Sequence, residues 1–276
     1  MTGTGRGVLE LLRSRRPSPV HVVDPFKVAV DEAVLKAVAV ERLGLPFLIL
    51  ASTDYEDFDA RMPDYVARVK AAVRIPVITH FPARPGAGLP VAPGADAMLC
   101  PALLGSHDDH FVWKSILQTA TGPGRGAGHV HRPPEMLLEA ALTFGDDAVS
   151  FDAMATVPVE RSPQALDFHV RVIRLLGFDV VYLYSRYEDV SQEVCRYFRQ
   201  RLRPEQLIFV GGGIRTRRHI DAYIRAGADY VVFAGALETP GWRAELEALC
   251  GRRLPAGTGS PAAATCRTDA GGGGPR

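Results

Sequence analysis

The sequence predicts an α/β fold, specifically a (β/α)8 TIM barrel whose third helix is replaced by a non-helical loop. Short apolar runs typical of buried parallel strands alternate along the chain with amphipathic helical stretches. Eight such runs can be counted, and eight parallel strand–helix units close into a barrel without exposed edges. Residues 84–94, RPGAGLPVAPG, are too rich in proline and glycine to form a crossover helix. An open doubly wound sheet is the second candidate.

The expected strands, taken in order, are bounded by turn residues and contain three or more apolar side chains. They are 19–24, 46–52, 76–82, 95–103, 148–153, 179–185, 206–214 and 230–236. Helical periodicity is expected over 31–44, 59–73, 107–120, 163–177, 189–202, 216–227 and 242–251. Gly44 is typical of a helix C-cap and Pro63 of a first helical turn, which supports the first two helices.

Composition indicates one domain without a nucleic-acid or membrane-spanning role. The net charge is +1, and no apolar run approaches the roughly 20 residues that span a bilayer, so we expect a soluble cytoplasmic protein that binds no nucleic acid. The four cysteines form no CxxC pair, which argues against zinc and disulfides. We expect an N-terminal helical arm over 1–18, a barrel over 19–251, and a disordered Gly-, Ala- and Pro-rich tail over 252–276.

The chemistry of such a barrel lies at the carboxyl ends of its strands. GGGIRT, 211–216, follows the seventh strand and opens a helix, and AGA, 234–236, ends the eighth. Glycines there let backbone amides approach an anion closely, and a helix start adds favourable partial charge. These two strand ends therefore predict a phosphate site.

Other polar residues at the strand ends allow more than one interpretation. Asp24 could bind Mg²⁺ or orient a substrate hydroxyl, or it could simply cap its own loop. Thr53 and Asp54 are candidate metal or diphosphate contacts. His80, Asp152 and Ser106 also fall near strand ends, but each alone is more typical of a satisfied structural polar group. We therefore do not assign these three residues a catalytic role from the sequence.

Several strand-end motifs occur together in a recognisable order: DP after the first strand, STD after the second, FP after the third, YLYS in the sixth, and GGGIRT after the seventh. Over roughly residues 19–238 this order resembles the geranylgeranylglyceryl phosphate synthase family, including its bacterial heptaprenylglyceryl phosphate synthase branch. The resemblance implies a TIM barrel lacking its third helix. It also implies a homodimeric prenyltransferase, which uses Mg²⁺ to join a prenyl diphosphate to a glycerol phosphate through an ether bond and makes a membrane-directed lipid.

Residue by residue, the resemblance places Asp24 and Thr53 at the Mg²⁺–diphosphate end. It implies that Tyr182 lies at the acceptor, where it or Tyr184 could stabilise passing positive charge through its ring. The residues that it assigns to the phosphate of the acceptor are Ser185, Gly212, Gly213, Ala234 and Gly235.

Departures from the family pattern bear on the acceptor. The family lysine two residues before the aspartate is Val22, and its asparagine after the eighth strand is Gly235. Tyr184 replaces the glutamate that receives the acceptor's hydroxyl hydrogens, and Arg186 replaces a glycine. Removing a negative charge and adding a positive one favours an acceptor bearing a carboxylate, such as 3-phosphoglycerate.

On that ground the chain is most similar to the branch that acts in moenomycin-type phosphoglycolipid antibiotic biosynthesis. This resemblance implies transfer of a farnesyl group to the 2-hydroxyl of 3-phosphoglycerate, with Asp24, Tyr182, Tyr184 and Arg186 at the reacting groups. Glycerol 1-phosphate is the alternative acceptor. Two other classes stay open: a phosphate-binding barrel isomerase using Asp24 and Asp152 as its acid and base, and a barrel that only binds ligands or partners.

Overall fold

The computed structural model describes residues 7–53, 56–121, 133–145, 152, 154–186 and 190–254. Eight parallel strands pair in chain order and close into a barrel, with β8 returning to β1, so the predicted TIM barrel is confirmed. The strands are β1 Ser18–Val23, β2 Leu48–Ala51, β3 Val77–His80, β4 Ala97–Leu103, β5 Glu135–Thr143, β6 Val180–Tyr184, β7 Leu207–Gly211 and β8 Tyr230–Phe233.

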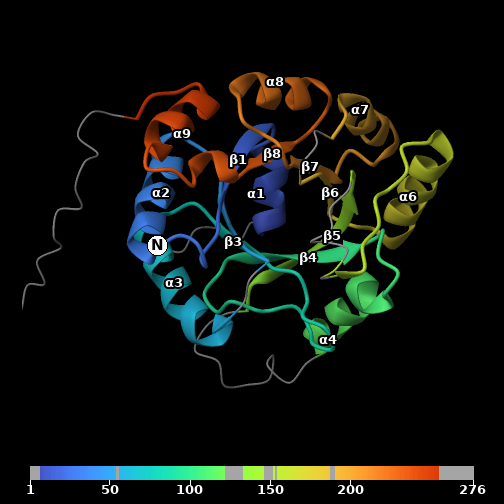
Figure 1. Ribbon diagram of the computed structural model, residues 1–276, viewed down its shortest axis with the longest axis horizontal. Helices are drawn as coiled ribbons and strands as arrows, with labels where there is room; N and C mark the ends of the chain where they lie inside the picture. Colours follow the sequence, from blue (N-terminus) through green and yellow to red (C-terminus); the bar gives the residue numbers. More distant parts are fainter. Residues whose placement is uncertain are drawn as a thin grey trace, which may run out of the picture.

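Helices surround the barrel in the order in which they follow the strands (Figure 1). Their bounds are α2 Val30–Arg42, α3 Phe58–Ala72, η1 His110–Lys114 with α4 Ser115–Thr121, α6 Pro163–Leu176, α7 Gln192–Arg201, α8 Arg217–Arg225, η3 Gly235–Leu237 and α9 Trp242–Cys250. Side-chain caps set several starts: Ser162 accepts from the Ala165 amide and Thr216 from the His219 amide. None of the helices in the described part of the chain has the length and apolar character needed to cross a bilayer.

The fifth strand is not where the sequence predicts it. The expected strand 148–153 is wrong: of those residues only Asp152 is described, and it is helical, whereas the strand is Glu135–Thr143. Two glutamates four residues apart obscure the apolar pattern of EMLLEAALT, yet the segment pairs with β4 and β6 over its length. A buried strand that carries a charged side chain shows no clear periodicity of apolar residues. In β5 the charged side chain is that of Glu139, which lines the cavity inside the barrel.

The connection from β3 to β4 contains no helix, as predicted, and runs between α3 and α4 in Figure 1. Its own apolar side chains fill the space that a helix would cover: Leu89 is 4% exposed and Ala92 is fully buried. The loop is tied to the helices that follow β4, because Thr119 Oγ1 accepts from the Leu89 amide and His110 Nε2 contacts the Arg84 carbonyl. The missing helix is thus replaced by anchored chain.

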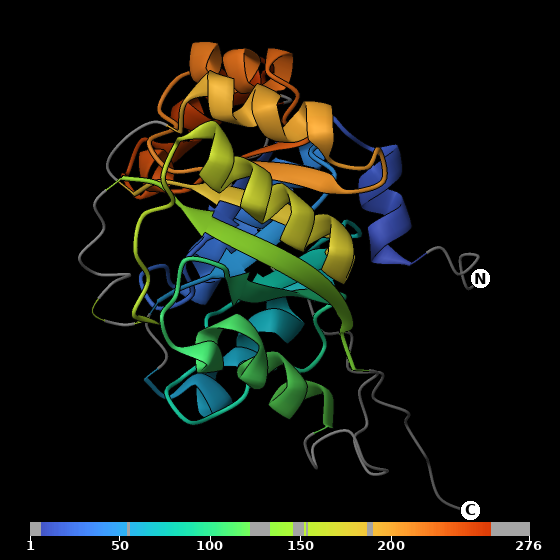
Figure 2. The ribbon, with the colours of Figure 1, turned by 90° about the vertical axis from the view of Figure 1, so that its right-hand side faces the viewer.

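The amino-terminal arm forms α1, Val8–Ser14, which lies at one end of the barrel (Figure 2). Leu12 is fully buried among interior residues of β2, β7 and β8, and its carbonyl accepts from Tyr230 Oη at 2.6 Å. The Glu135 carboxylate accepts from the Val8 amide at the start of the helix. Helix α1 therefore closes the barrel end opposite the predicted site. Residues 255–276, most of the predicted tail, lie outside the described residues, and the domain bounds stay a prediction.

Candidate active site

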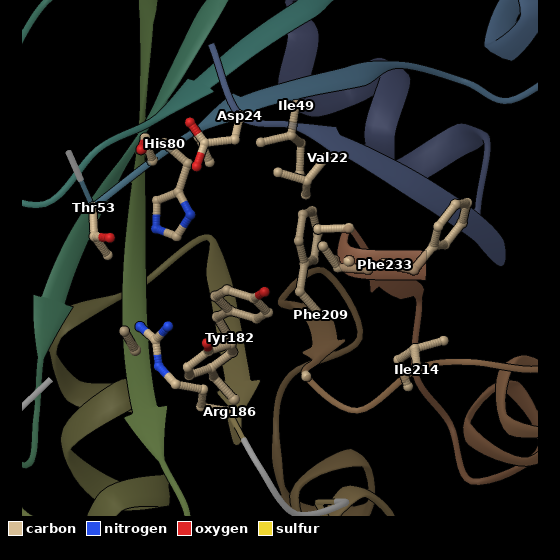
Figure 3. A pocket seen from close by; sticks show the side chains of 18 of the residues that line it. Val22, Asp24, Ile49, Thr53, His80, Tyr182, Arg186, Phe209, Ile214 and Phe233 are labelled. Carbon is tan, nitrogen blue, oxygen red and sulfur yellow. The ribbon is translucent and has the colours of Figure 1, made fainter. Parts of the chain in front are cut away.

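One cavity of about 800 Å³ lies at the carboxyl ends of the strands and joins residues that the sequence singled out at six strand ends. Figure 3 shows Asp24, Thr53, His80, Tyr182 and Arg186 pointing into it. The predicted site residues that line it are Asp24, Thr53, Tyr182, Tyr184, Arg186, Gly212, Gly213, Ala234 and Gly235. Asp54 lies outside the described residues, and Asp152 is exposed and does not line this cavity, so the acid–base pair of the isomerase hypothesis is not assembled here.

The glycine end of the cavity is built by close backbone packing. Gly212 has φ +92° and Gly213 has φ +66°, values that favour glycine. A Cβ at Gly212 would lie 1.5 Å from the Ser185 carbonyl oxygen, so only glycine fits there. Ser185 itself is 2% exposed and lies behind the cavity wall, where its amide donates to the Gly211 carbonyl at 3.2 Å. Ser185 is not among the residues that line the cavity, and its assignment to the acceptor phosphate stays a prediction.

The Asp24 end of the cavity carries both signs of charge. Asp24 Oδ1 accepts from the Phe26 amide at 2.9 Å, and Oδ2 lies 3.5 Å from Lys27 Nζ. Lys27 Nζ is also 3.9 Å from the Glu238 carboxylate. Asp24 therefore caps its own loop, which was one of the two interpretations of this residue in the sequence, and it also lines the cavity.

A magnesium ion would fit this end only together with a substrate. Among the described residues, no group of three or more His, Cys, Asp and Glu side chains could hold a metal. Mg²⁺ is, however, commonly bound by one or two carboxylates together with substrate phosphates and water. Asp24 keeps acceptor capacity beyond its single hydrogen bond, since a carboxylate can accept about four. The residues present suit Mg²⁺ that arrives with a diphosphate.

The end of β6 supplies aromatic rings and a guanidinium to the cavity. The rings of Tyr182 and Tyr184 lie 5.8 Å apart, and Tyr182 packs edge-on against His80 at 5.7 Å. Burial, with smaller effects of Tyr184 and Glu139, raises the pKa of Tyr182 well above its ordinary value. Its hydroxyl therefore keeps its proton at neutral pH. Arg186 follows the strand and points into the cavity (Figure 3), and no carboxylate is found among the described residues of β6 and the two that follow it, 180–186.

A histidine and a buried glutamate are in contact at the cavity wall, one from β3 and the other from β5. His80 Nε2 lies 3.1 Å from Glu139 Oε1, and the glutamate side chain is 0% exposed. Burial lowers the pKa of His80, but the charge of Glu139 and its hydrogen bond raise it more, so the net shift is upward. Sequence reasoning set His80 aside and missed Glu139. In the sequence, Glu139 is marked only as a charged residue within an apolar run. It was missed because the fifth strand was predicted at residues 148–153 instead.

Apolar side chains line the rest of the cavity, which suits a hydrocarbon ligand. On the side of β3, β4 and β5 they include Pro82, Leu99, Leu103 and Met154. Val22, at the position where the resemblance implies a lysine, lines the wall beside Ile49 (Figure 3). The cavity therefore combines a charged end, a glycine cradle and an apolar wall.

Comparison with known proteins places the chain in a family, although no protein-family model matches it. The geranylgeranylglyceryl phosphate synthase of Ignicoccus hospitalis is 30% identical over 238 residues, which cover 83% of this chain and 91% of that protein. This chain belongs to the geranylgeranylglyceryl phosphate synthase family. As a member of that family it is a prenyltransferase, so the enzyme class expected from the sequence is confirmed.

Other members of the geranylgeranylglyceryl phosphate synthase family match over most of their length. The enzyme of Nitrosopumilus maritimus is 26% identical over 216 residues, 76% of this chain and 80% of the relative. The synthase of Thermoplasma acidophilum, solved with its substrate sn-glycerol 1-phosphate, superposes with a TM-score of 0.73 at 24% identity, over 90% of this chain and 98% of that one. The structure from Thermoplasma volcanium gives a TM-score of 0.74 at 20% identity. These superpositions show the shared fold.

Proposed function

We propose that this chain forms an ether by transferring a prenyl group from a prenyl diphosphate to a hydroxyl of a phosphorylated three-carbon acceptor. The observation that supports it best is the single cavity that joins Asp24, the glycines after β7 and β8, and an apolar wall. A prenyl diphosphate needs a place for its charge and a place for its chain, and the acceptor needs a second phosphate site. The alternative that the barrel only binds ligands does not account for family membership.

The two ends of the cavity are proposed to bind different groups, the diphosphate at the Asp24 end and the acceptor phosphate at the glycine end. When bound, Mg²⁺ held by Asp24, Thr53 and the diphosphate would neutralise the negative charge of the diphosphate leaving group. Lys27, 3.5 Å from Asp24, adds a positive charge of this chain at the same end. As the bond to the diphosphate weakens, the ring faces of Tyr182 and Tyr184 can stabilise the allylic positive charge by about 0.5–2 kcal/mol.

We propose 3-phosphoglycerate as the acceptor, with farnesyl diphosphate as the donor that the branch resemblance implies. Tyr184 and Arg186 both line the cavity, and residues 180–186, the described part of this strand end, contain no carboxylate. A guanidinium at this place can pair with an acceptor carboxylate through two parallel hydrogen bonds, which a neutral glycerol end does not offer. The role in moenomycin-type antibiotic biosynthesis follows from this acceptor and is part of the same proposal.

Glycerol 1-phosphate is the second candidate, and the comparisons favour it over 3-phosphoglycerate. The relatives are named as geranylgeranylglyceryl phosphate synthases, and the Thermoplasma acidophilum enzyme was solved with sn-glycerol 1-phosphate. The two acceptors differ only at the terminal carbon, which is a hydroxymethyl group in one and a carboxylate in the other. The choice therefore depends on the side chains at the end of β6.

A substrate panel tests the proposal: geranyl, farnesyl and geranylgeranyl diphosphate, each with Mg²⁺ and with either acceptor, scored for the ether product. We expect the highest kcat/KM with farnesyl diphosphate and 3-phosphoglycerate. Turnover with glycerol 1-phosphate alone would refute the carboxylate argument and leave prenyl transfer standing. An absence of ether with every pair would refute the proposed function itself.

A double variant asks whether the end of β6 selects the acceptor. Tyr184→Glu with Arg186→Gly restores the family charges, and we expect it to shift the kcat/KM ratio of the two acceptors towards glycerol 1-phosphate by 10-fold or more, about 1.4 kcal/mol. Arg253→Gly removes the same charge from an exposed non-helical position outside the cavity and should leave the ratio unchanged. An unchanged ratio in the double variant would show that these positions do not choose the acceptor.

A further inference from the structure

The pair formed by the His80 imidazole and the Glu139 carboxylate has no part in the chemistry described so far, although both side chains line the cavity. Glu139 projects from β5 into a barrel interior whose neighbouring cluster consists of apolar and aromatic side chains. Burial of an ionised carboxylate is costly unless it is paired. Within the described part of the chain, neither oxygen of Glu139 has a hydrogen-bond partner apart from the His80 contact at 3.1 Å. A purely structural interior would be better served by an aliphatic residue.

The pair has the geometry of an oriented base. Glu139 engages Nε2 of His80, and no hydrogen bond described in the structure occupies the other ring nitrogen, Nδ1. The ring is 20% exposed at the end of β3 and faces the cavity beside Tyr182 (Figure 3). An imidazole that is oriented by a carboxylate on one nitrogen and open on the other is the arrangement in which histidine takes a proton from a hydroxyl.

No other described group at the end of β6 can take that proton. Residue 184 is a tyrosine, and the guanidinium of Arg186 is a hydrogen-bond donor with no acceptor atom. Tyr182 keeps its own proton, because burial raises its pKa well above the ordinary value. By contrast, a carboxylate–imidazole pair lies on the third and fifth strands of the same cavity.

We propose that His80, oriented by Glu139, receives the hydroxyl proton of the acceptor during prenyl transfer. The acceptor oxygen forms a bond to C1 of the prenyl group, and the bond from C1 to the diphosphate oxygen breaks with its electron pair leaving on the diphosphate. The hydroxyl proton moves to Nδ1, and the Glu139 carboxylate neutralises the imidazolium that results. His80 is then a catalytic residue and Glu139 a positioning residue. This inference rests on the proposed function.

The surroundings of His80 give the step a definite pH dependence. The titratable groups packed against its ring are Glu139 on β5 and Tyr182 on β6, while Asp24 and Arg186 face the same cavity. The net effect of burial and Glu139 is to raise the pKa of His80 above that of free histidine. The ring is therefore neutral, and able to accept a proton, only at a pH above this raised pKa. The rate of product formation should therefore rise with pH through that raised pKa.

The test compares His80→Gln and Glu139→Gln with the unmodified protein, using farnesyl diphosphate, Mg²⁺ and each acceptor in turn. We expect His80→Gln to lower kcat about 100-fold, with the KM for farnesyl diphosphate changed less than about 3-fold, and to flatten the acidic limb of the pH profile. Glu139→Gln should retain a limb that is shifted to lower pH, because the carboxylate no longer raises the pKa of His80. A merely structural pair would not move the limb in this way.

The outcomes separate this inference from the proposed function. If the unmodified protein forms no ether with any pair, the proposed function fails and this inference with it. If it forms ether and His80→Gln keeps kcat and the acidic limb, the inference alone is overturned. If the variants do not fold, the ring ¹⁵N signals of His80 in the unmodified protein are followed on adding acceptor and farnesyl thiolodiphosphate. A shift at Nδ1 supports the contact, and unchanged signals overturn it.

Discussion

Substituting Gly212 by alanine probes the backbone fit behind the proposed phosphate site. The native φ of +92° costs a non-glycine residue about 1–2 kcal/mol. The new Cβ would also lie 1.5 Å from the Ser185 carbonyl oxygen, and forcing an extra carbon into packed structure costs about 1–3 kcal/mol. We therefore expect Gly212→Ala to lower the free energy of unfolding by about 2–5 kcal/mol and to raise the KM for the acceptor, because the loop must move.

Gly177→Ala is the matched control, and urea unfolding is the assay. Gly177 ends α6 with φ +71° and has nothing within 4 Å of an added Cβ, so it should lose only the backbone part, about 1–2 kcal/mol, with kinetics unchanged. Equal losses in the two variants would refute the close contact with Ser185. A Gly212→Ala protein as stable as the unmodified one would refute the backbone argument as well.

Three further predictions test other parts of the site. Asp24→Asn should abolish Mg²⁺-dependent binding of farnesyl diphosphate in calorimetry while acceptor binding persists, because the proposed acceptor phosphate site is formed by the glycines after β7 and β8 and not by Asp24; retained Mg²⁺ dependence would contradict this. Burial lowers the pKa of His21 to about 3, so the unfolded chain takes up a proton below pH 6.5 that the folded chain refuses. The free energy of unfolding should then fall as pH falls from 6.5 towards 3, by up to about 1.4 kcal/mol per unit, and urea unfolding of His21→Gln should lack that slope. Lys36 is 1% exposed and donates to the Leu237 carbonyl at 2.8 Å, beside Gly235. Lys36→Met should raise the acceptor KM by loosening this turn; an unchanged KM would show that the turn holds without it.

The sequence by itself determined the barrel, the absence of a helix after β3 and most of the strand ends that carry the site. These features depend on local properties, since apolar runs form buried strands and proline with glycine prevents a helix. Because all parallel strands of a barrel end on the same side, Asp24, Tyr184 and Gly212 could be assigned to one site without coordinates. Their shared cavity is consistent with that assignment.

Only the tertiary structure decided the rest of the site. Glu139 lies in a strand whose charged residues hide the strand periodicity, and the role proposed for it depends on His80. That residue ends β3, two strands away in the barrel, and its Nε2 lies 3.1 Å from Glu139 Oε1. Ser185 was expected at the phosphate but lies behind Gly212, because the two backbones pack against each other there. Both results come from contacts between segments distant in sequence. Such contacts are set by barrel closure and side-chain packing, which no local pattern of residues records.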